Sequence, residues 1–152
     1  MNILIVGARE RDTEEDRQTV CTLMDRLDAE APRSTFVSML THTGVGRFVK
    51  EKCLERDDQG SFRFSFIEFS TRVYSHSQSK SDLSKLYLAR NASPFEYGDV
   101  LIYLASEDRR GTMEDMLDRF LDAHRPVIIL RPGEQLPDTI LKFEVQHAVS
   151  LT

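Results

Sequence analysis

The fold is decided by the stretch Gly98-Asp-Val-Leu-Ile-Tyr-Leu-Ala-Ser-Glu-Asp-Arg-Arg-Gly-Thr112 together with Pro126-Val-Ile-Ile-Leu130. Residues 100–105 are almost continuously apolar, as in a parallel strand covered on both faces. Apolar residues then recur at the spacing of one helical stripe: Met113, Met116, Leu117, Phe120 and Leu121. A strand, a turn, a helix and a second strand in this order predict a βαβ unit.

The preceding residues show the same alternation of strands and helices. Residues 3–6 predict a buried strand, and Asp12 or Thr13 predicts the N-cap of a helix that runs to about Ala29. Further on, the sequence predicts a strand over 35–41, a glycine loop over 42–47, a helix over 48–56, a strand over 61–69 with a bulge or two buried faces, a polar loop over 70–81, and a helix from Asp82 that ends before Pro94. We therefore expect one doubly wound α/β domain over residues 1–152, with a mostly parallel sheet of five or six strands.

The C-terminal segment fits two structures. Pro137-Asp138 is a fair helix start, whereas apolar and polar residues alternate from Leu141 to Leu151. We favour an edge strand there.

Composition narrows the classes of function. The chain has 20 basic and 25 acidic residues and a net charge of −5, so we expect neither nucleic-acid nor membrane partners. The apolar run near the N-terminus has only four residues, 3–6, which is too short for a signal peptide; we therefore expect a cytoplasmic protein. Cys21 and Cys53 fit buried thiols, and the four histidines have no metal-ligand spacing, so no metal or cofactor is expected.

In doubly wound sheets ligands bind at the carboxyl ends of the strands. The loops expected there are 7–11, 42–47, 70–81 and 106–112. Arg9 and Arg110 lie beside predicted helix starts, where a guanidinium and free backbone amides favour an anion. We predict that both side chains are exposed at one end of the sheet, although solvated loop charges would have the same sequence.

Four short motifs resemble a known superfamily. They are Gly7-Ala-Arg9, Thr43-Gly-Val-Gly46, Arg90-Asn91 followed by Asp99, and Gly111-Thr112 followed by Arg125-Pro-Val-Ile-Ile129. In order and placement they resemble the Rossmann-like SLOG superfamily, which includes YspA-type proteins and LOG-type phosphoribohydrolases. The resemblance covers nearly the whole chain and implies a nucleotide or nucleotide-derived phosphate ligand. The resemblance and the loop positions together assign the following residues to ligand binding: Gly7, Ala8, Arg9, Thr43, Gly44, Gly46, Arg47, Asn91, Arg110, Gly111 and Thr112.

The sequence departs from this family where catalysis is concerned. Asp115 stands where LOG-type enzymes have their catalytic glutamate, and Glu114 is one residue away from that position. Arg47 stands where YspA-type proteins have an aspartate. Thr112 and Asp115 also fit a capping box. N-glycoside hydrolysis, with Glu114 or Asp115 as the acid and Arg90 holding the substrate, is thus an alternative to binding.

A second alternative is a homodimeric interaction module, which the resemblance also implies. Tyr87, Tyr97 and Tyr103 could supply the aromatic anchors of its interface, or equally well be core residues.

Overall fold

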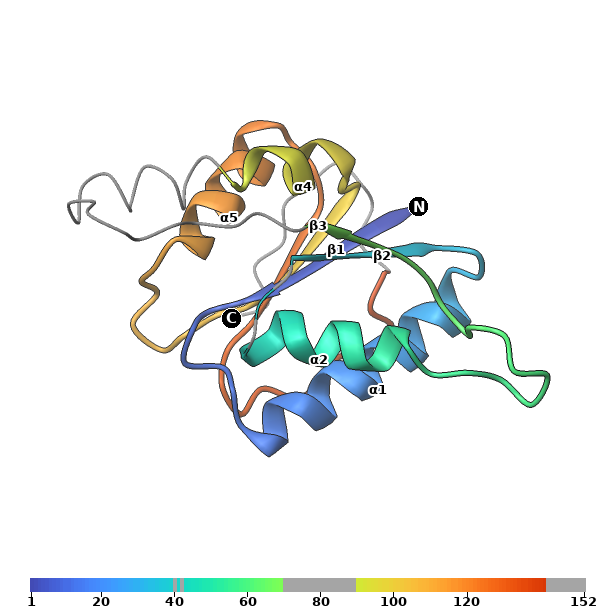
Figure 1. Ribbon diagram of the computed structural model, residues 1–152. Helices are drawn as coiled ribbons and strands as arrows, with labels where there is room; N and C mark the ends of the chain where they lie inside the picture. Colours follow the sequence, from blue (N-terminus) through green and yellow to red (C-terminus); the bar gives the residue numbers. More distant parts are fainter. Residues whose placement is uncertain (40, 42, 70–89, 142–152) are drawn as a thin grey trace, which may run out of the picture.

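The computed structural model describes residues 1–39, 41, 43–69 and 90–141 (Figure 1). In these residues the sheet is entirely parallel, with the strand order β3-β2-β1-β4-β5. Its strands are β1 (Asn2–Gly7), β2 (Thr35–Met39), β3 (Ser65–Phe69), β4 (Val100–Leu104) and β5 (Val127–Leu130). The predicted doubly wound α/β domain is confirmed, with five strands in the described part. The predicted edge strand over 141–151 lies almost wholly outside it.

Helices cover both faces of the sheet. They are α1 (Glu14–Glu30), α2 (Gly44–Cys53), α4 (Ala92–Tyr97) and α5 (Met113–Asp122). Figure 1 shows α1 and α2 on one face and α4 and α5 on the other. Along β1, Ile3 and Ile5 join the core under α1 and α2, whereas Leu4 and Val6 join the core under α5. Burial on both faces explains why these strands are continuously apolar.

The start of α1 follows the sequence closely. Thr13 is the N-cap: its hydroxyl accepts from the Asp16 amide at 3.1 Å, and the Asp16 carboxylate accepts from the Thr13 amide at 3.2 Å. This reciprocal pair is a capping box, and it confirms Thr13 as one of the two predicted N-caps. Asp12, the other candidate cap, instead accepts a hydrogen bond from the Gly44 amide at 2.7 Å. The first loop is thereby tied to the start of α2.

Residues 44–47 belong to a helix, so the predicted glycine loop over 42–47 is wrong at these four positions. Helix α2 begins at Gly44 rather than at 48, and it ends at Cys53 rather than at 56. The glycines serve close packing of this helix on the sheet. A Cβ on Gly7 would lie 2.2 Å from the Val45 side chain, and a Cβ on Gly46 would lie 2.5 Å from a β2 carbonyl oxygen.

The third strand is shorter than predicted, because it begins at Ser65 instead of 61. Phe62 precedes it, forms an isolated antiparallel bridge with Arg56 and is 48% exposed, whereas Phe64 is buried. Within the strand, Phe66 packs against the core under α1 and α2, and Phe69 packs against the core under α5. The register with β2 is unbroken, so the predicted alternative of two buried faces is confirmed and the bulge is wrong. β2 likewise ends at Met39 rather than at 41.

Pro94 lies near the start of a helix in the described residues. It lies in the first turn of α4, where the backbone amide needs no partner within the helix and proline is tolerated. The residues before it, 70–89, are outside the described part of the chain, so the predicted loop over 70–81 and the helix from Asp82 are not described. No helix begins at Pro137-Asp138 within the described residues up to 141.

Two burial expectations also change. Cys53 is fully buried, but Cys21 is only partly buried. Leu121 is 38% exposed, so the buried stripe of α5 ends at Phe120. Within the described ranges, no helix combines the length and apolar character needed to cross a membrane.

Candidate functional site

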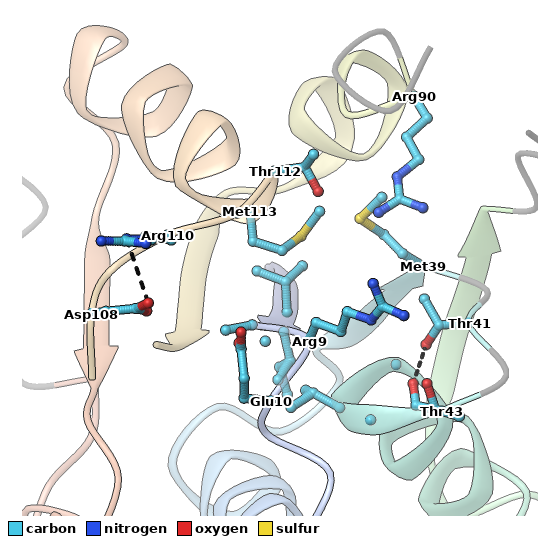
Figure 2. Close-up of a pocket in the computed structure, with 18 residues that line it drawn as sticks. Arg9, Glu10, Met39, Thr41, Thr43, Arg90, Asp108, Arg110, Thr112 and Met113 are labelled. Carbon is cyan, nitrogen blue, oxygen red and sulfur yellow. Dashed lines mark hydrogen bonds and ion pairs between the residues drawn. The ribbon is translucent and has the colours of Figure 1, made fainter. Parts of the chain in front are cut away.

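A cavity of about 730 Å³ lies at the carboxyl end of β1, where the strand order reverses between β2 and β4 (Figure 2). This is the place where doubly wound sheets bind ligands. Most of the residues that the sequence assigned to binding line it, and Arg90 does too: Gly7, Ala8, Arg9, Thr43, Gly44, Gly46, Arg90, Arg110, Gly111 and Thr112. Segments more than 100 residues apart in the chain thus meet in one hollow.

Two arginines dominate the charge of the cavity. Arg9 extends from the loop after β1, and Arg90 comes from the turn before α4. Figure 2 shows their guanidinium groups pointing toward one another across the cavity, beside Met39. Arg9 is exposed, and its guanidinium makes no hydrogen bond or ion pair with the described residues. Together the two side chains concentrate positive charge on one side of the cavity.

Arg110 lies at the same end of the sheet as Arg9, and both are exposed, so their predicted placement is confirmed. Its guanidinium, however, forms an ion pair with Asp108 at 3.5 Å, and its side chain is 83% exposed. Figure 2 shows this pair directed away from Arg9 and Arg90. Arg110 therefore belongs to the rim of the cavity.

The N-terminus of α2 is already partnered by a carboxylate. The Gly44 amide donates to Asp12, and the Thr41 hydroxyl donates to the Thr43 carbonyl at 2.8 Å. Thr43 is the N-cap, but its side chain makes no capping hydrogen bond. Asp12 thereby takes one of the free amides that the start of this helix would otherwise offer to an anion.

The floor of the cavity is apolar. Ile5 and Val6 line it from β1, and Met39 and Met113 line it from β2 and α5. The two methionines are buried, with 4% and 8% exposure, and their polarizable sulfur atoms suit contact with an aromatic ring. The cavity thus combines a cationic side with an apolar surface.

Asn91 and Asp115 do not line this cavity. The Asn91 side chain is fully buried and donates to the Thr112 carbonyl and to the Asp115 carboxylate, both at 3.1 Å. Asp115 also accepts from Arg119 at 2.7 Å. Thr112 makes no side-chain capping bond, so the capping-box alternative for Thr112 and Asp115 is wrong. These contacts join the start of α4 to the start of α5.

Glu114 and Arg47 also lie outside the cavity lining. Glu114 pairs with Arg109 at 2.9 Å, while Arg47 lies along α2 beside Glu51 and the Phe48 ring. Arg109 has a positive φ of 55°, a strained conformation for a side chain with a Cβ. The pair with Glu114 holds it in place and so fixes the loop that leads to Arg110.

The tyrosines are divided between core and surface. Tyr103 is fully buried beneath α5, and burial, followed by the neighbouring Glu114 carboxylate, raises the pKa of its phenol. It is therefore a core residue and cannot anchor an interface. Tyr97 is 50% exposed and packs on Phe69 with ring centroids 5.3 Å apart. Tyr87 lies outside the described residues.

Sequence reasoning missed Arg11, which has only 5% exposure. Its Nε donates to Asp16 at 2.7 Å, and its Nη1 donates to the carbonyl oxygens of Ala105 at 2.8 Å and Leu130 at 2.9 Å. The side chain thus joins the first loop to the ends of β4 and β5. Nothing in its spacing distinguishes it from the exposed Arg9, since burial depends on where the other two strands end.

Two acidic residues of the cavity were also missed, Glu10 and Asp108. Over the described ranges, no group of three or more His, Cys, Asp or Glu side chains is arranged to hold a metal ion. Comparison of the chain with family models, with curated proteins and with solved structures gave no match. The assignment of a function therefore depends on the geometry of the cavity.

Proposed function

We propose that this protein binds a nucleotide or a nucleotide-derived phosphate ligand in the cavity at the carboxyl end of β1. The observation that carries the proposal is the pair of guanidinium groups, Arg9 and Arg90, that face one another across the cavity. Like charges directed at one point repel, and an anion between them turns this repulsion into attraction. Guanidinium groups suit phosphate in particular, because their planar forks bind its oxygens in pairs.

The remaining surface of the cavity favours a ligand larger than phosphate itself. A volume of about 730 Å³ is in the range of small-molecule sites, which is roughly 300–1,000 Å³. Met39 and Met113 offer sulfur atoms to a flat ring such as a nucleobase. The sequence resemblance to the SLOG superfamily, which several of the cavity residues carry, points to the same class of ligand.

A thermal-shift panel tests this proposal directly. It contains the four ribonucleoside 5′-monophosphates, ADP-ribose and cyclic nucleotides, each well above its expected Kd. A ligand at 100 times its Kd adds about 2.7 kcal/mol, which raises the Tm of a domain of this size by roughly 5–11 °C. If no phosphate-bearing nucleotide raises the Tm, the proposal is wrong.

Variants then locate the ligand in the cavity. Arg9→Ala should weaken the binding of the best nucleotide about 10- to 150-fold, because it removes a charge-assisted hydrogen bond worth about 1.5–3 kcal/mol. Arg131→Ala is the matched control, since Arg131 is exposed and does not line this cavity. Equal losses in the two variants would show that the effect is only one of net charge.

Hydrolysis of an N-glycosidic bond is less well supported than binding. It needs a carboxylate near the anomeric carbon, and Glu114 and Asp115 are engaged with Arg109, Asn91 and Arg119 outside the cavity. Release of free base from the nucleotide panel, measured by chromatography and lost in Asp115→Asn, would place hydrolysis ahead of binding.

A further inference from the structure

The cavity separates its charges. Arg9 and Arg90 face one another on one side, whereas Figure 2 shows the Glu10 carboxylate on the opposite side of Arg9 from the Arg90 guanidinium. Glu10 is exposed, and its carboxylate makes no hydrogen bond or ion pair in the described ranges 1–39, 41, 43–69 and 90–141. Asp108, which also lines the cavity, is different, because it is paired with Arg110. Glu10 is thus an acidic group directed at the ligand space without a partner among the described residues.

An acid beside an anion site is unfavourable for a ligand that carries only phosphate, since like charges repel. It becomes favourable when the same ligand also carries hydrogen-bond donors, because an ionised carboxylate accepts hydrogen bonds and cannot donate them. A sugar diol offers two adjacent hydroxyl donors to the two oxygens of one carboxylate. Acidic residues bind ribose hydroxyls in this way in other dinucleotide-binding α/β folds, although there the acid follows a different strand.

We propose that Glu10 accepts hydrogen bonds from sugar hydroxyl groups of the ligand, so that the cavity selects ribonucleotides over deoxyribonucleotides. This inference rests on the proposed function, because it takes the phosphate to lie between Arg9 and Arg90. Arg9 and Glu10 are consecutive residues of one loop, so phosphate and sugar are contacted by neighbouring side chains. The apolar floor formed by Met39 and Met113 remains for the base.

The test compares the Kd values of the four ribonucleoside 5′-monophosphates with those of their 2′-deoxy counterparts by isothermal titration calorimetry. Wild-type protein should bind the best ribonucleotide at least about tenfold more tightly than its deoxy form, the effect of one hydrogen bond to a charged group. In Glu10→Ala this preference should disappear, because the ribonucleotide loses the bonds of both its hydroxyl groups to Glu10, whereas the deoxy form has only the bond of its 3′-hydroxyl group to lose. Such selectivity would not result from a general structural defect.

Glu15→Ala is the matched control, because Glu15 is an exposed acid in the first turn of α1 and does not line the cavity. It should keep the wild-type preference for ribonucleotides. If wild type binds both sugars equally, or if Glu10→Ala keeps the preference, the role of Glu10 is overturned while nucleotide binding stands. If wild type binds none of these nucleotides, the proposed function fails and this inference fails with it.

Discussion

Replacement of Arg11 by alanine should destabilise the protein far more than replacement of any exposed arginine. The change removes a buried ion pair with Asp16 at 2.7 Å and the hydrogen bonds to the Ala105 and Leu130 carbonyl oxygens at 2.8 and 2.9 Å. The Asp16 side chain is only 9% exposed and would keep its charge with no cation beside it. Breaking a buried pair from one side costs about 3–5 kcal/mol, a large part of the roughly 5–15 kcal/mol that stabilises a typical domain.

Thermal and urea denaturation measure this loss. A cost of about 3–5 kcal/mol corresponds to a fall in Tm of roughly 6–20 °C for a chain of this size. Arg131→Ala, at an exposed position, should stay within about 0.5 kcal/mol of wild type. Arg11→Lys should recover only part of the stability, because lysine lacks the planar fork that reaches the carboxylate and the carbonyls together.

A double-mutant cycle with Asp16→Asn decides whether the pair itself is responsible. The two changes should be strongly non-additive, since each removes the same contact. If Arg11→Ala is no more harmful than Arg131→Ala, or if the two losses add, the reasoning about this buried pair is wrong.

Three further predictions concern positions away from the cavity charges. Gly46→Ala should lower the free energy of unfolding, because its methyl group would lie 2.5 Å from a β2 carbonyl oxygen; unchanged stability in urea denaturation would contradict this close packing. Thr13→Ala should cost about 1 kcal/mol by the same assay, whereas Thr43→Ala should cost less, since Thr43 makes no side-chain capping bond; equal losses would contradict this. Burial raises the pKa of the Cys53 thiol from 9.0 to about 12, so the folded state disfavours the thiolate. This contribution is complete below pH 9 and is lost as pH rises from 9 toward about 12, by about 1.4 kcal/mol per pH unit. Urea denaturation between pH 9 and pH 10 should show a steeper loss in wild type than in Cys53→Ala, and parallel curves would refute it.

The fold followed from local patterns that are independent of distant contacts. Continuous apolar runs such as residues 100–105 identify strands buried on both faces, and the two candidate N-caps, Asp12 and Thr13, place the helix start to within one residue. The prediction of a loop over 42–47 was wrong because Gly44 and Gly46 are typical of a loop when only local preference is considered. In the structure their small size instead allows α2 to approach β1 and β2 closely.

The candidate site was predictable in place but less so in detail. The rule for carboxyl strand ends predicted that Arg9 and Arg110 lie at one end of the sheet, and the family resemblance added Arg90; all three line the cavity. It could not foresee that Arg110 would pair with Asp108, because that contact depends on the path of the loop after β4. The burial of Arg11 was equally hidden, since its partners lie 94 and 119 positions further along the chain.

The loop after β1 explains how the cavity is kept in shape without a ligand. Arg9 and Glu10 reach into the cavity, while the next two residues bind elsewhere: Arg11 to the ends of β4 and β5, and Asp12 to the start of α2. Thr13 then caps α1. Because each of these contacts ties the loop to a different element, the backbone at Arg9 is held in position before any anion arrives, and only the side chain of Arg9 remains to be ordered on binding. Arg11→Ala, measured at a temperature where it is still folded, should therefore weaken nucleotide binding although Arg11 does not line the cavity, and unchanged affinity would mean that the loop keeps its shape by other contacts.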